Sequence, residues 1–166
     1  MKIAWRAHLI IVRLNKNKYY KHAAKSRGSG YQQYLSMIVD GNSKNQMAIP
    51  RPPQGRMPSS LAGESLLEQG NMTVRVHNSS NLCYISQVGL TGASAGADGT
   101  VNAIARSLKW LDRVNRVGKV LYLQLDNTSG DNKNRYVMAF LAFLVQIRIF
   151  EKVKVSFMEV ATLMKT

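Results

Sequence analysis

The sequence predicts a mixed α/β domain in which three strands precede an alternation of helices and strands. Short apolar runs rich in β-forming residues occupy 34–39, 72–76 and 82–88, with no helical pattern between them. Helical periodicity then marks 101–114 and 136–147, and each of these segments is followed by a further strand, at 120–125 and 153–157. This order predicts an antiparallel three-strand meander followed by parallel crossover connections.

The first segment, residues 1–30, is predicted to be a basic helical arm attached to a domain at 31–166. Trp5, Leu9, Val12 and Tyr19/Tyr20 recur at roughly helical spacing, and Gly28 follows the last basic residue. The first 39 residues contain eight Lys and Arg and no Asp or Glu. We expect contacts to nucleic acid from this arm; packing of a surface helix through its apolar stripe is the alternative. The contacts are assigned to Arg13, Lys16 and Lys18.

Within the domain, the run at 34–39 is predicted to be a buried strand that ends in a turn at Asp40-Gly41. All four prolines fall between residues 50 and 58, and we expect a Pro/Gly-rich loop at 50–71. Thr100 is the expected N-cap of the helix at 101–114. The segment 136–147 is apolar on every side, which predicts a buried helix.

The composition indicates a polyanionic partner. The 166 residues include 23 Lys and Arg against 9 Asp and Glu, which gives a formal charge of +14. Such an excess favours nucleic acid through phosphate neutralisation, and a basic surface or a solubilising tail is the alternative. The partner that we expect is DNA. No apolar stretch approaches the ~20 residues that span a bilayer, so we expect no membrane contact. Cys83 is the only cysteine, which favours a reducing, intracellular location, with the nucleus as one such compartment.

The segment that begins at Asp126 is the one richest in side chains that could bind a ligand or take part in a reaction. It ends an apolar strand and precedes a helix, and ligand sites of open α/β sheets collect at such carboxyl ends. A carboxylate there suits Mg²⁺ or Mn²⁺, which take oxygen ligands. Asn132, Lys133, Asn134 and Arg135 add donors near a helix start, where phosphate binds well. The alternative is that these polar residues only form turns and caps.

These residues also carry a resemblance. Leu123-Gln124-Leu125-Asp126-Asn127, followed by Asn132-Lys133-Asn134-Arg135, resembles an uncharacterised transposon-associated domain family that is itself similar to DDE transposases. Residues 34–41 and 150–157 fit the same pattern. The resemblance implies a ribonuclease-H-like mixed sheet, and it covers roughly residues 5–50 and 119–158.

The resemblance also implies site residues. Asp40 would be the first catalytic and metal-binding carboxylate and Asp126 the second, on neighbouring strands, for metal-dependent phosphodiester cleavage or strand transfer. The family's Gly-His-Thr and later acidic residues are absent after Phe157, and Glu159 is the last carboxylate. We therefore expect an incomplete, C-terminally truncated copy.

Three hypotheses follow. The first is a fragment of a transposon-derived nuclease or transposase-like domain, inactive as it stands. The second is a non-catalytic basic module that binds nucleic acid. The third is a product of a decayed reading frame that folds poorly.

Overall fold

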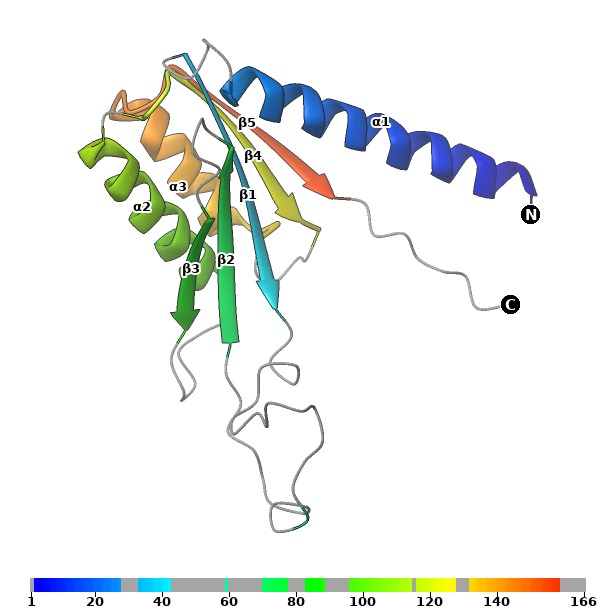
Figure 1. The fold of residues 1–166 in the computed structure, drawn as a ribbon, viewed down its shortest axis with the longest axis horizontal. Coiled ribbons are helices and arrows are strands. Elements are labelled where there is room, and N and C mark those ends of the chain that lie inside the picture. The colour runs from blue at the N-terminus through cyan, green and yellow to red at the C-terminus, as the bar shows by residue number, and fades with distance from the viewer. Residues whose placement is uncertain are drawn as a thin grey trace.

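The computed structural model describes residues 2–27, 33–42, 59, 70–77, 83–88, 96–114, 116–127 and 132–158. Most of the loop predicted at 50–71 lies outside these residues, as do Glu159 and the segment 78–81 between the two predicted strands. The described elements form a five-stranded mixed sheet with the strand order β3-β2-β1-β4-β5 and three helices (Figure 1). The mixed α/β class predicted from the sequence is confirmed.

The first three strands form the antiparallel half of the sheet. Strand β1 (Tyr34–Asn42) pairs with β2 (Gly70–His77), and β2 pairs with β3 (Cys83–Val88). The turn predicted at Asp40-Gly41 is wrong, because β1 continues through both residues. They pair with Thr73 and Met72, so the antiparallel partner extends the strand beyond its apolar run.

The last two strands form the parallel half. Strand β4 (Val120–Asp126) pairs with β1 on one side and with β5 (Lys152–Met158) on the other, both in parallel. The predicted pairing of 34–39 with 120–125 is confirmed, from Tyr34 opposite Val120 to Val39 opposite Leu125. Strand β1 is therefore the central strand that joins the two halves.

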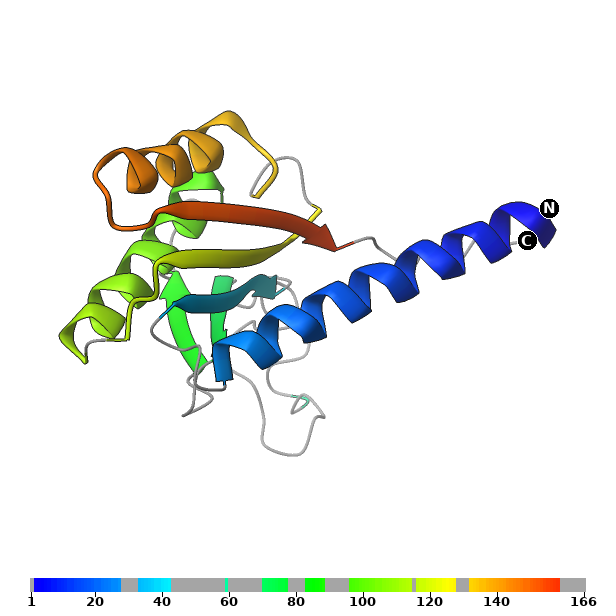
Figure 2. The same ribbon diagram turned by 90° about the horizontal axis from the view of Figure 1, so that it is seen from above.

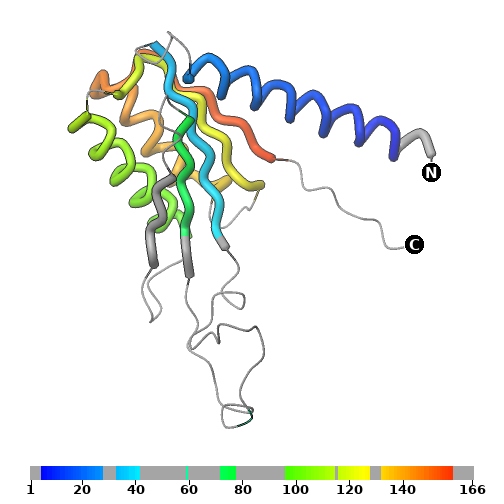
Figure 3. Tube along the Cα trace, in the orientation of Figure 1, coloured from blue at the N-terminus to red at the C-terminus, as the bar shows by residue number. Residues whose placement is uncertain are grey.

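Helices α2 (Ala97–Arg113) and α3 (Arg135–Gln146) cover one face of the sheet (Figure 3). Their buried apolar residues, Ile104, Leu108 and Leu111 from α2 and Leu141 and Leu144 from α3, pack with Leu35, Met37, Val39, Leu121, Leu123 and Leu125 in one core. Helix α2 begins earlier than predicted. Gly96 is at its N-cap, and Thr100 lies inside the first turns, so the N-cap predicted at Thr100 is wrong.

Helix α3 is buried on only one side, which corrects the prediction that it is buried all round. Val137, Leu141 and Leu144 are buried, whereas Tyr136 and Phe143 are 60% and 51% exposed. The two helices form a single layer, so the side of α3 away from the sheet has nothing over it among the described residues. Apolar composition predicted burial without showing how many neighbours the helix has.

Helix α1 (Lys2–Arg27) lies on the opposite face of the sheet. Figure 2 shows its C-terminal half against the strands, while its N-terminal half projects past the carboxyl ends of β4 and β5. Ser26 fixes the docked end: its hydroxyl donates to the carbonyl of His77 and accepts from the amide of Ser36, at 3.1 Å. None of the helices in the described residues is long and apolar enough to cross a membrane.

Candidate functional site

Asp40 and Asp126 form a carboxylate pair at the carboxyl edge of the sheet. Each follows a fully buried residue of the core, Val39 and Leu125, and these two residues are paired in the parallel register. Because successive side chains alternate between faces, both carboxylates lie on the α1 face of the sheet. Neighbouring strands are about 4.8 Å apart, so the two side chains are within reach of one small ligand.

The electrostatics reflect this proximity. Burial raises the pKa of Asp40, the negative charge of Asp126 raises it further, and a hydrogen bond from the Gly41 amide partly offsets both. The carboxylate of Asp126 accepts a hydrogen bond from the Asn127 amide, with an N–O distance of 2.6 Å. Like charges on adjacent strands make simultaneous ionisation costly, and a cation between them relieves that cost.

The donor set fits one hard cation better than two. Two carboxylates are enough for a divalent ion that keeps several water ligands, as Mg²⁺ does. Among the described residues, no group of three His, Cys, Asp or Glu side chains is placed to hold a metal. A two-metal site needs further ligands, so the described part of the chain supplies ligands for at most one of the two cations.

A groove runs beside the carboxylate pair, between α1 and the sheet. Its volume is about 240 Å³, and we call it the α1 groove. Helix α1 contributes Val12, Asn15, Lys16, Tyr19 and Tyr20, and the strands contribute Ile38, Gln124 and Met158. Ile38 and Gln124 precede Asp40 and Asp126 by two residues on the same face, so the floor of the groove leads to the carboxylates.

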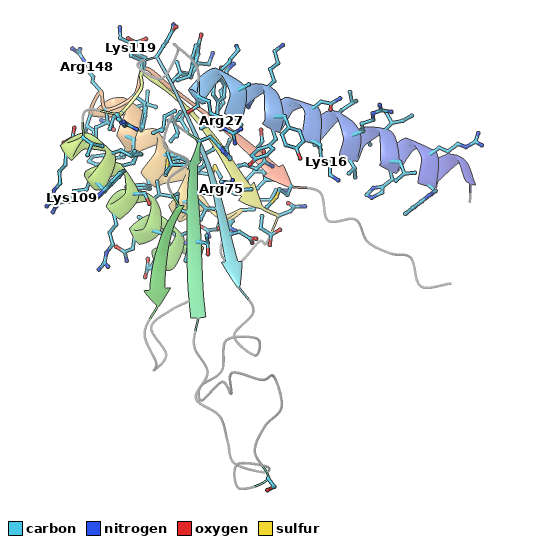
Figure 4. The ribbon with its side chains drawn as sticks, in the orientation of Figure 1. Lys16, Arg27, Arg75, Lys109, Lys119 and Arg148 are labelled. Atoms are coloured by element: carbon cyan, nitrogen blue, oxygen red, sulfur yellow. The ribbon has the colours of Figure 1, made fainter. Side chains whose placement is uncertain are left out.

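The basic residues predicted to contact nucleic acid from α1 lie on the surface. Arg13, Lys16 and Lys18 are all exposed, and Lys16 lines the α1 groove (Figure 4). No acidic residue lies in the first turn of α1, and Lys25 and Arg27 are in its last turn. The helix therefore carries an uncompensated positive charge along its whole length.

The residues predicted to bind nucleic acid at the start of α3 divide into two pairs. Asn132 is 2% exposed and accepts a hydrogen bond from the Thr100 hydroxyl at 2.8 Å, so its predicted contact with nucleic acid is wrong. Asn134 is the N-cap of α3, and its side chain accepts hydrogen bonds from the amides of Tyr136 and Val137. The hydrogen bonds described here for Asn132 and Asn134 fit the alternative given above, in which these residues form turns and caps.

Lys133 and Arg135 are exposed and lie over aromatic rings. The Nζ of Lys133 is 5.6 Å from the centre of the Phe157 ring, and the guanidinium of Arg135 is 4.9 Å from that of Tyr136. Such cation–π contacts orient a cation without neutralising it. These two residues keep the charge that their predicted role requires.

An aromatic cluster under α1 was missed by reasoning from the sequence. The ring of His22 stacks on that of Tyr122 with 3.8 Å between centroids, and Tyr34 stacks on the same ring at 5.8 Å. Lys25 lies over Tyr34 and Lys154 over Tyr122. One signal could have indicated it: Tyr122, Gln124 and Asp126 alternate with leucines along β4, so an aromatic residue with a hydroxyl shares the face of the strand that carries its polar side chains.

The family comparison covers the C-terminal part of the chain, from β2 onward. A family model with the description "Domain of unknown function (DUF7869)" matches residues 71–162, more than half of the chain. The matched residues include Asp126 and most of the sheet, while α1 and Asp40 precede them. No curated protein and no solved structure matches this chain.

Proposed function

The chain belongs to this family of unknown function (DUF7869), and we propose that it carries a ribonuclease-H-like, DDE-type site for divalent-cation-dependent phosphodiester chemistry. The observation that carries the proposal is the carboxylate pair. Asp40 and Asp126 lie at equivalent positions of adjacent parallel strands, on one face of the sheet, and burial together with the charge of Asp126 raises the pKa of Asp40.

The sheet order supports the proposal. Three antiparallel strands followed by two parallel ones, in the order β3-β2-β1-β4-β5, is the arrangement that the resemblance to ribonuclease-H-like domains implies. In that arrangement the central strand β1 and its parallel neighbour β4 carry the first two acidic ligands. The family description names no activity, so the proposal depends on the geometry and on the residues that carry the resemblance.

Two groups of residues have different roles in the proposed function: the carboxylates bind the cation, and the basic residues of α1 attract the phosphate backbone. Asp40 and Asp126 hold one Mg²⁺ or Mn²⁺, which supplies charge stabilisation to a phosphate oxygen when it is bound. Lys16 and its neighbours on α1 attract the phosphate backbone to the same edge of the sheet. Because the described residues supply no third acidic ligand, we expect cation binding with little or no turnover.

The test is the thermal stability of the purified chain with and without cation. A cation that binds only the folded state stabilises it, by about 1.4 kcal/mol at a free concentration ten times Kd. We expect Mg²⁺ or Mn²⁺ to raise the Tm of the wild type but not of Asp126→Asn. Asp112→Asn is the matched control, because Asp112 is an exposed acid on α2. An equal rise in Asp126→Asn, or none in the wild type, would contradict the proposal.

A second candidate is a non-catalytic module that binds nucleic acid through α1. The observation that favours it is the exposed, acid-free helix with eight basic residues. Replacing Arg13, Lys16 and Lys18 together by Gln should lower the salt dependence of DNA binding. The logarithmic slope should decrease by up to about 0.9 for each phosphate that the variant no longer neutralises.

The charge-matched control for this second candidate is on α2, where Arg106, Lys109 and Arg113 are exposed on the opposite side of the sheet. Replacing these three residues by Gln removes the same charge from a different surface. If the slope decreases equally in both triple variants, the binding is a general effect of net charge and α1 has no special role.

A further inference from the structure

The lining of the α1 groove combines aromatic, amide and cationic side chains with apolar ones. Tyr19 and Tyr20 form an aromatic wall with ring centroids 5.3 Å apart. Asn15 and Gln124 add amides that can pair with the edge of a base, and Lys16 adds the single charge of the lining. No carboxylate is among the lining residues, so an anionic ligand meets no repulsion within the groove itself.

Tyr20 is the residue best placed to stack on a ligand. Its side chain is 65% exposed although it lines the groove. Tyr19 is fixed behind it, because its hydroxyl is 2.6 Å from Nε2 of His77. The two rings are tilted by 58° to each other, so the exposed ring of Tyr20 is the one available for a base to stack on, while Tyr19 is held in place beside it.

The floor of the α1 groove lies close to the carboxylate pair, which determines how a bound ligand would be oriented. Ile38 and Gln124 on the floor lie two residues before Asp40 and Asp126, which is a distance of roughly 7 Å along the strands. A nucleotide seated in the groove would therefore have a neighbouring phosphate close to the two carboxylates. This places a recognition site and the proposed cation site on one continuous path.

We propose that the α1 groove binds one nucleotide of a single-stranded nucleic acid, with its base against Tyr20 and its phosphate near Lys16. Bases inside a duplex are stacked on each other and cannot reach a tyrosine in a groove, whereas single strands stack readily on exposed aromatic side chains. The inference rests on the proposed function in taking nucleic acid as the ligand, and it adds the strand type and the residues that select it.

The experiment measures binding of the full chain to a fluorescent 12-nucleotide single strand and to the matching duplex, in EDTA and at one salt concentration. We expect tighter binding to the single strand. Tyr20→Ala should weaken it roughly five-fold or more, because each base stacked on an aromatic ring contributes on that scale. Tyr20→Phe, which keeps the ring, should restore it.

Phe143→Ala is the matched control, since Phe143 is an aromatic side chain that is 51% exposed on α3, on the other side of the sheet. It should leave single-strand binding unchanged. Equal affinity for the duplex, or equal losses in Tyr20→Ala and Phe143→Ala, would overturn the proposal. The Tm of each variant without ligand verifies folding.

The two proposals fail separately in this design. Tyr20→Ala should keep the cation-induced rise in Tm, and Asp126→Asn should keep single-strand binding in EDTA. If the wild type shows no cation-induced rise in Tm but still prefers the single strand, the proposed cation site is rejected and the proposed nucleotide site is retained. Loss of strand preference alone would discard the groove and leave the carboxylate site.

Discussion

The hydroxyl of Tyr19 lies 2.6 Å from Nε2 of His77, which joins the middle of α1 to the end of β2. On the other side of the imidazole, the guanidinium of Arg27 is 3.3 Å from Nδ1. Since a guanidinium can only donate, Nδ1 accepts and Nε2 carries the proton that is donated to Tyr19. The contact therefore requires a neutral histidine, which makes the attachment of α1 sensitive to pH.

The first prediction concerns that sensitivity. Burial, together with the positive charges of Arg27 and Arg75, lowers the pKa of His77 to about 4 from an ordinary value of 6.5. The unfolded chain therefore binds a proton at a higher pH than the folded chain. Stability should be highest above pH 6.5 and should fall as the pH drops toward 4, by about 3 kcal/mol at most.

His77→Gln is the variant that tests it, since Gln has no titratable group. Urea unfolding of both proteins between pH 7.5 and pH 4 should show a smaller loss of stability in His77→Gln. Carboxylates titrate in the same range, but both proteins share them, so the difference between the two curves reports His77. Parallel curves would mean that His77 is not neutral in the folded state or does not affect stability.

The second prediction concerns Asp40 in the absence of cation. Its pKa is raised, so the folded state holds its proton more tightly than the unfolded state, and ionisation at neutral pH costs stability. Asp40→Asn should therefore raise the Tm in EDTA at pH 7.5. The gain should be below about 1 kcal/mol because Asp40 is exposed and solvent screens the charges. It should vanish below pH 3.8, where the carboxyl is protonated in both states.

The centre of the sheet could be predicted because β1 and β4 contain nearly continuous apolar runs. Leu121, Leu123 and Leu125 on β4 and Leu35, Met37 and Val39 on β1 are buried in one core, and such runs are typical of central strands. Their pairing was expected from the resemblance to the ribonuclease-H-like fold, which implies that the first and fourth strands are neighbours, and β1 and β4 are paired in parallel. Once those two strands were paired, the placement of Asp40 beside Asp126 followed from their equivalent positions.

The contacts across α1 could not be predicted, because they join residues that are far apart in the sequence. His77 and Tyr19 are separated by 58 positions, and neither stands in a recognisable motif. The burial of Asn132 depends in the same way on Thr100, 32 positions earlier. Local patterns give the type of each element, but they do not show which polar side chains the packing of those elements will enclose.

The third prediction separates the cap at Asn134 from the predicted phosphate contact. Its side chain accepts hydrogen bonds from the amides of Tyr136 and Val137, both at 3.0 Å. Asn134→Ala should cost about 1 kcal/mol in urea unfolding, whereas Asn134→Asp or Asn134→Ser should cost much less because both remain good caps. DNA affinity should be equal in the Ala and Ser variants once folding is complete. A ten-fold loss in folded Asn134→Ala, with Asn134→Ser unaffected, would restore the phosphate contact.

The last prediction concerns the start of β4, where Gly118 packs against the backbone of the central strand. A Cβ added to Gly118 would lie 2.9 Å from both the N and the carbonyl C of Tyr34. These are backbone atoms, held by the pairing of Tyr34 with Val120, so they cannot move aside as a side chain could. Gly118→Ala should therefore destabilise the protein by about 1–3 kcal/mol, the usual cost of overpacking.

Gly41→Ala provides the comparison on the same sheet. A Cβ at Gly41 would meet only the side chain of Met72, at 3.7 Å from Cε and 3.8 Å from Sδ, which are ordinary contacts. Its free energy of unfolding should stay within about 0.5 kcal/mol of the wild type, as for most substitutions without a clash. Because Gly41 follows Asp40, this variant also tests whether the carboxylate edge tolerates a side chain. Equal losses in the two variants would show that the approach of Gly118 to Tyr34 is not what limits stability there.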